Sequence, residues 1–100
     1  MMFPKPSRIQ NRELLRAVAQ QPCAACGRRP PSDGANDPHH VTTKGSGGGD
    51  IPTNIMPLCR EHHTEWDKIG PCRMMVKYMG VERWLIRNGR FDVLEKRRAP

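Results

Sequence analysis

The sequence predicts a small α+β protein in which a bound metal takes over part of the role of a hydrophobic core. Its 100 residues are 36% hydrophobic and only 5% aromatic, which leaves little apolar surface to bury. Four cysteines and four histidines are available as metal ligands, and a structural metal contributes folding free energy directly. Apolar residues are spaced for helices towards both ends of the chain and for short strands between them. We therefore expect a single domain over residues 1–100.

An N-terminal helix is predicted over residues 7–20. Its apolar side chains recur at helical spacing, Ser7 is a suitable N-cap, and Pro22 ends the helix. Residues 23–68 form the predicted metal-braced core. This core includes a brief strand at residues 55–58 that leads into a helix from about Cys59 to about Lys68.

Two C-terminal helices are predicted within residues 71–89, after Gly70 and Pro71 stop the preceding helix. They cover residues 71–79 and 81–88, so that Gly80 and Gly89 stand just past their ends. Residues 90–100 complete the chain as a basic tail. The apolar side chains of these helices are expected in the core: Met74, Met75, Tyr78, Trp84 and Leu85.

The net charge of +7 favours a polyanionic partner, because Lys and Arg contacts to phosphates release condensed counterions. A merely solvated basic surface is the alternative, and charge alone does not separate the two. No apolar run approaches the ~20 residues that cross a bilayer, and residues 1–5 lack a signal-peptide hydrophobic region. We expect no membrane association and a cytoplasmic location, where thiols stay reduced.

The strongest signal is the pair of half-sites Cys23-x-x-Cys26 and Cys59-x-x-His62, whose spacing suits a tetrahedral structural zinc site. A redox Cys-x-x-Cys is the alternative, but no βαβ pattern follows it. Cys72 is outside the pattern and is interpreted as a buried thiol or as an alternative to His62.

His62 and His63 are expected to serve two different sites, because neighbouring residues on a helix project about 100° apart. Residues four apart share a face, which pairs His62 with Trp66 and His63 with Asp67. The apolar neighbour suits His62 to the structural zinc, and the carboxylate suits His63 to an open divalent-ion site. Alternatively, Asp67 is a surface residue in a charge pair with Lys68 or Arg60.

His39 and His40 are expected on a strand, where neighbouring side chains point in opposite directions. One of them can then bind a metal while the other faces a substrate phosphate. They lie between the two zinc half-sites, in an interval longer than that of a simple zinc finger, and they precede the glycine-rich run at residues 45–49. This placement indicates a functional insertion with an active-site loop, rather than a plain flexible linker.

With these residues placed, the sequence resembles the HNH endonucleases, especially the small zinc-containing kind found in bacteriophage and bacterial genomes. The resemblance rests on CAACG at 23–27, HHVTTKGSGGGD at 39–50, NIMPLCREHHTE at 54–65 and, more loosely, KYMGVERWLIRNG at 77–89. It implies a ββα-metal (HNH) motif with a Cys3His zinc site, flanked by an N-terminal helix and C-terminal helices. Relatives often carry a histidine where this chain has Asp67.

The resemblance also implies roles for individual residues. His39 and His63 would bind a catalytic Mg²⁺, Mn²⁺, Ni²⁺ or Zn²⁺ ion, with Asp67 as a further ligand. His40 would be the general base, and Asn54 would tether the loop and hold that base. Apart from the resemblance, the basic side chains expected to contact nucleic acid are Lys44, Arg60, Arg73 and Lys77, with Arg83, Arg87 and Arg90 left open as alternatives.

The implied activity is metal-dependent hydrolysis of DNA phosphodiester bonds by a one-metal mechanism that leaves 5′-phosphate ends. A noncatalytic zinc-dependent nucleic-acid-binding module is the alternative; it would have no use for the histidine and asparagine set. RNA is an alternative substrate, and the chain can act as a monomer or a homodimer.

Overall fold

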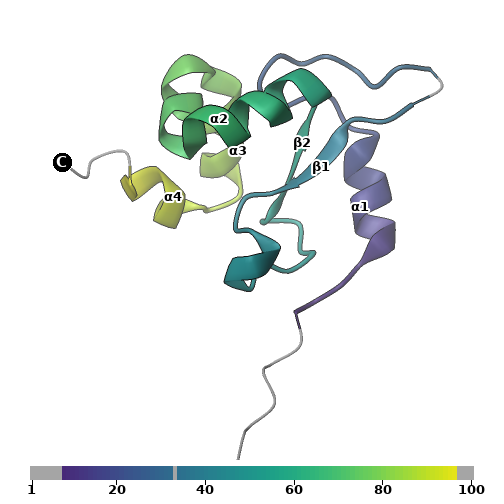
Figure 1. Cartoon of the computed structure of the whole chain (residues 1–100), viewed down its shortest axis with the longest axis horizontal. Coiled ribbons are helices and arrows are strands. Elements are labelled where there is room, and N and C mark those ends of the chain that lie inside the picture. The colour runs from purple at the N-terminus through teal and green to yellow at the C-terminus, as the bar shows by residue number, and fades with distance from the viewer. Residues whose placement is uncertain (1–7, 33, 97–100) are drawn as a thin grey trace, which may run out of the picture.

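The computed structural model describes residues 8–32 and 34–96, which form a two-stranded sheet with helices on both sides (Figure 1). The predicted α+β class is confirmed. In chain order the elements are α1 Arg12–Ala19, β1 Asp37–His40, the 3-10 helix η1 Lys44–Ser46, β2 Ile55–Leu58, α2 Arg60–Lys77, α3 Met79–Arg87 and α4 Phe91–Lys96.

Strands β1 and β2 are antiparallel, with His39 opposite Met56 and His40 opposite Ile55. Opposite residues share a face of a sheet and successive residues alternate between faces. The two neighbouring histidines therefore point to opposite sides, as the sequence predicted. Because a lone hairpin is only marginally stable, both faces need cover. Helix α1 lies on one side of the sheet and α2 and α3 lie on the other (Figure 1).

The main core lies between the sheet and helices α2, α3 and α4. Met56 and Leu58 of β2 are fully buried there. Burying an aliphatic side chain of this size stabilises the fold by ~1.5–3 kcal/mol. Two of the cysteines, Cys23 and Cys59, belong to the same cluster, so the metal ligands are continuous with the core. The other principal members are Trp66, Met74, Met75, Val81, Trp84, Leu85 and Val93.

Helix α1 is shorter than the predicted 7–20 and begins five residues later. Its N-cap is Asn11, whose side chain accepts a hydrogen bond from Leu14 N–H; the expected cap, Ser7, lies outside the described residues. The backbone N–H of Asn11 donates to the Asp50 carboxylate, which draws the preceding residues away from the helix axis. The helix ends at Ala19, before Pro22.

Helix α2 contains the break predicted at Gly70 and Pro71. Gly70 has φ 80° and ψ 169°, so two helical segments meet there at a kink rather than through a loop. The boundary expected at Gly80 is wrong, because Gly80 lies inside α3. Its missing side chain serves packing instead: a Cβ there would come within 2.0 Å of the Ala24 carbonyl oxygen.

Residues 90–100 are not simply a basic tail, because Phe91–Lys96 forms helix α4 and buries Val93 in the core. The segment has too few apolar residues for a helical periodicity to be recognised in the sequence. The end of the predicted tail, residues 97–100, lies outside the described residues. Within the described ranges, the helices are too short or too polar to cross a membrane.

Candidate functional site

The first half of the Cys3His cluster is a tight turn at residues 23–27. Gly27 has φ 76° and donates its N–H to the Cys23 carbonyl oxygen at 2.7 Å, a backbone conformation that glycine adopts without strain. Ala24 N–H donates to the carbonyl oxygen of Pro57 in β2 at 2.8 Å. The turn is thereby held against the strand that leads into α2, where the other two ligands lie.

The ligand atoms of Cys23, Cys26, Cys59 and His62 all lie within 4.8 Å of one another. The Sγ atoms of Cys26 and Cys59 are 4.0 Å apart, and His62 Nδ1 is 3.0 Å from Cys59 Sγ. Tetrahedral zinc with bonds of ~2.3 Å to sulfur needs sulfur atoms ~3.8 Å apart. The cluster can therefore hold a metal ion such as zinc.

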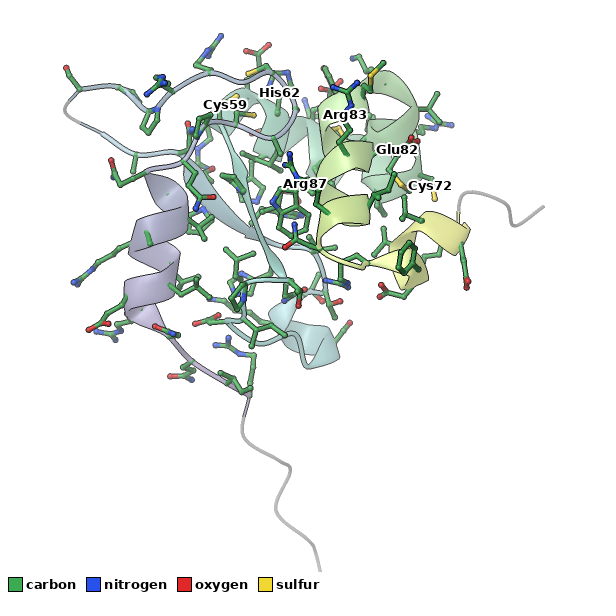
Figure 2. The ribbon with its side chains drawn as sticks, turned by 180° about the vertical axis from the view of Figure 1, so that it is seen from behind. Cys59, His62, Cys72, Glu82, Arg83 and Arg87 are labelled. Carbon is green, nitrogen blue, oxygen red and sulfur yellow. The ribbon has the colours of Figure 1, made fainter. Side chains whose placement is uncertain are left out.

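Cys72 does not join this cluster. Figure 2, which views the molecule from behind, shows Cys59 and His62 together at the start of α2 and Cys72 well away from both. The suggestion that Cys72 could replace His62 is therefore wrong. The aromatic ring against His62 is that of Tyr78, with centroids 4.8 Å apart, whereas the ring of Trp66 lies against His39.

The thiols of the cluster have unequal acidities. Burial raises the pKa of Cys59 to about 11, and the neighbouring Cys23 adds to the effect. Burial also acts against the Cys23 thiolate, yet backbone N–H groups of Cys59 and Cys26 lower its pKa overall. Since metals bind thiolates, filling the cluster must displace the Cys59 proton, and metal affinity should fall in acid.

His39 is almost completely buried, with 5% of its surface exposed. Its ring centroid lies 4.5 Å from that of Trp66 and 4.9 Å from that of His63. Burial lowers the His39 pKa to about 3, and the neighbouring His63 and His40 act in the same direction. Its Nε2 atom is buried and has no hydrogen-bond partner among the described residues. A neutral imidazole with an unused nitrogen is suited to binding a metal.

His63 does not pair with Asp67. Its Nδ1–H donates to Asp37 Oδ2 at 2.8 Å, which leaves Nε2 free to bind a cation in the manner of carboxylate-supported metal ligands. Asp67 is exposed, and no side-chain hydrogen bond or ion pair joins its carboxylate to another described residue. Asp37 was missed, although it stands two residues before His39 on the same strand and must therefore share its face.

His40 projects from the other face and forms a hydrogen bond with Asp50, with 2.7 Å between His40 Nε2 and Asp50 Oδ1. Asp50 is 4% exposed and also accepts hydrogen bonds from Asn11 N–H at 2.8 Å and from Arg8 at 2.9 Å. The Asn11 N–H, followed by the His40 and Arg8 side chains, lowers the Asp50 pKa to about 2. Asp50 ends the segment HHVTTKGSGGGD, but nothing in its local sequence indicates that it bonds to His40.

Asn54 ties down the loop between the strands. Its Nδ2 donates to the carbonyl oxygens of Thr42 and Gly49, and its Oδ1 accepts from Thr42 N–H at 2.7 Å. A Cβ at Gly48 would lie 1.9 Å from the Thr42 oxygen, so glycine is required where the loop closes. From beyond α3, Arg90 donates to Asn54 Oδ1 at 2.9 Å. No local sequence signal could have revealed this long-range contact.

The basic residues expected to contact nucleic acid differ in exposure and in whether they form ion pairs. Lys44 and Arg73 are exposed and form no ion pair with a described residue. Arg60 Nε lies 3.4 Å from Asp37, although the side chain is 81% exposed. Lys77 is paired with Glu65, which makes it less available than expected. Arg83 and Arg87 also project from α3 (Figure 2).

Fold and site together define a small α+β protein with a Cys3His metal-ligand cluster and a separate set of histidines and carboxylates. The family described as "Protein of unknown function (DUF968)" matches residues 1–69, so the chain belongs to that family. The matched region includes the whole cluster, His39, His40, Asn54 and His63, whereas α3 and α4 lie beyond it.

A relative in Escherichia coli (strain K12), "Uncharacterized protein YdfU", is 41% identical over 68 residues. The match covers 65% of this chain and 18% of the relative, so the chain spans less than a fifth of that protein's length. No solved structure matches the chain significantly.

Proposed function

We propose that this protein is a metal-dependent DNA endonuclease of the HNH type. The observation that carries the proposal is the order β1–β2–α2, with two histidines on opposite faces of β1, an asparagine clamping the intervening loop, and a third histidine on the helix. We interpret them as the elements and side chains of a ββα-metal motif. The Cys3His cluster sits against the same helix, and we assign it to structural Zn²⁺.

The catalytic ion is proposed to bind His39 and His63. The buried, unpartnered His39 Nε2 and the orientation of His63 by Asp37 support this assignment. When bound, a divalent ion would neutralise charge on the scissile phosphate. Asp67 is no longer favoured as its third protein ligand, since its side chain is exposed and the carboxylate bonded to His63 is that of Asp37.

His40 is proposed as the general base. It takes a proton from a water molecule as the water oxygen forms a new bond to phosphorus. The bond from phosphorus to the 3′ oxygen breaks, and that oxygen takes a proton from solvent water to become a 3′-hydroxyl, which leaves 5′-phosphate on the other product. General-base catalysis of this kind contributes on the order of 10²–10⁴-fold. Asn54 keeps the loop closed beside His40.

DNA is the proposed polyanion because the net charge is +7 and several cationic side chains, including Lys44 and Arg73, are exposed and unpaired with described residues. The histidine set lies outside the Cys3His cluster and has no role in filling it. This surplus of positioned histidines favours an enzyme over a simple binding module.

The direct test is cleavage of plasmid DNA by the purified chain with Mg²⁺, Mn²⁺, Ni²⁺ or Zn²⁺, with the product ends mapped. His40→Ala should lose cleavage by on the order of 10²-fold or more while keeping its zinc content and melting temperature. Glu13→Gln, which changes an exposed residue on α1, is the control and should cut normally. DNA binding without cleavage in every metal would favour the noncatalytic module, and preferential cutting of RNA in a parallel assay would change the substrate.

A further inference from the structure

The contacts of Asp50 determine which nitrogen of His40 carries a proton. A carboxylate only accepts hydrogen bonds, and Asp50 stays ionised because its pKa is about 2. The 2.7 Å contact therefore requires His40 Nε2–H to donate to Asp50 Oδ1. In the neutral ring the other nitrogen, Nδ1, is then the bare acceptor. It has no hydrogen-bond partner among residues 8–32 and 34–96.

Asp50 is itself held in place by three hydrogen bonds to one segment of the chain. Its Oδ2 accepts from Asn11 N–H, its Oδ1 accepts from Arg8, and its own N–H donates to the Ile9 carbonyl oxygen at 2.8 Å. The segment at residues 8–11 thus encloses the carboxylate, leaving it 4% exposed. A buried, fully engaged carboxylate restricts the imidazole more than a mobile surface group could.

We propose that Asp50 is a positioning residue that acts through His40, fixing the Nε2–H tautomer and directing the bare Nδ1 towards the water to be activated. This inference rests on the proposed nuclease function. In the step concerned, the water proton passes to His40 Nδ1 while Nε2–H stays bonded to Asp50, and the hydroxide oxygen bonds to phosphorus. The bond from phosphorus to the 3′ oxygen breaks, and that oxygen takes a proton from solvent water. Asp50 neither touches the substrate nor takes up the proton.

The test combines kinetics with a direct view of the tautomer. Asp50→Asn keeps the size of the side chain but removes its charge and one acceptor oxygen. It should lower kcat by on the order of 10²–10⁴-fold with KM unchanged. Because Asp50 acts through His40, the double variant with His40→Ala should be no slower than His40→Ala alone. Glu13→Gln, which changes an exposed carboxylate on α1, should cut at the normal rate.

A loss that appears only in KM, or that adds in full to the loss caused by His40→Ala, would overturn the proposal. Nitrogen-15 NMR of His40 in the unmodified protein gives a readout that needs neither activity nor a folded variant. A neutral ring protonated at Nε2 is expected, and a ring protonated at Nδ1 would refute the role of Asp50. If no metal supports cleavage, the nuclease proposal fails, and the tautomer still shows whether Asp50 orders His40.

Discussion

At the scale of single residues, two neighbouring histidines have different surroundings. His62 is buried, and its Nδ1 faces Cys59 within the metal cluster. His63 turns to the sheet and donates to Asp37. The turn of about 100° between consecutive helical residues produces this separation. His62 thus belongs to the cluster that can stabilise the fold, and its neighbour His63 belongs to the site of the proposed reaction.

Replacing each histidine by alanine should separate these roles. His62→Ala is expected to lower the metal content and the melting temperature, because the cluster loses one of four ligands. His63→Ala should retain the metal of the cluster and a near-normal melting temperature but lose cleavage. Metal analysis, calorimetry and plasmid cleavage on both variants provide the test. Identical behaviour of the two variants would contradict the division.

His39 should make stability sensitive to mild acid. Its pKa in the folded protein is about 3, below the usual 6.5, mainly because of burial. Between these values the unfolded chain binds the proton and the folded chain does not, so the free energy of unfolding falls as pH drops from 6.5 towards 3. The contribution of one such group approaches about 1.4 kcal/mol per pH unit.

Denaturant unfolding of the unmodified protein and of His39→Gln at pH 7 and pH 5, without added catalytic ion, measures this effect. The unmodified protein should lose more stability over that interval, because glutamine does not titrate. Equal losses would show that His39 has an ordinary pKa in the folded protein.

At the scale of elements, helix α3 is positioned by its close approach to the cysteine turn. Gly80 lies where an added Cβ would be 2.0 Å from the backbone oxygen of Ala24, which lies between Cys23 and Cys26. Moving either backbone apart would cost free energy. The turn at Ala24 is hydrogen-bonded to β2, and α3 carries the buried Val81 and Leu85. The position of α3 therefore depends on the position of the turn that carries Cys23 and Cys26.

Gly80→Ala should be destabilising although alanine is the better helix former by about 1 kcal/mol. The steric conflict is expected to outweigh that gain and cost a net ~1–3 kcal/mol, with weaker metal retention. Gly45→Ala is the matched control, because a Cβ there meets nothing within 4 Å. Thermal unfolding and competition with a chelator on both variants check this; an unchanged or more stable Gly80→Ala protein would show that α3 can move aside.

At the scale of the whole molecule, the cluster joins parts of the chain that are far apart in sequence. It links the turn after α1 to the start of α2, and Cys23 and Cys59 are continuous with the main core. The sheet that carries His39 and His40 has only two strands. A sheet this small depends on its surroundings for stability. The proposed active site therefore depends on the metal cluster for its shape.

Removing the metal should unfold much of the protein. Binding free energies of about 10–16 kcal/mol for structural zinc in small peptides rival the 5–15 kcal/mol stability of whole domains. Treatment with a chelator should abolish the cooperative thermal transition seen by circular dichroism, and Zn²⁺ should restore it. Cys72→Ser, outside the cluster, should respond as the unmodified protein does. A melt unaffected by complete metal removal would exclude a structural role.

Local spacing predicted the α+β class, the strand at residues 55–58, the break at Gly70 and the Cys3His cluster, although it left Cys72 open as an alternative to His62. These features are readable because their ligand spacing, periodicity and backbone requirements act over a few residues. Tertiary structure alone decided the rest. Asp37 rather than Asp67 faces His63, Asp50 holds His40, and Arg90 reaches Asn54. Such pairings depend on how separate elements pack against one another. The local sequence around a carboxylate or guanidinium group does not indicate which distant residue it will contact.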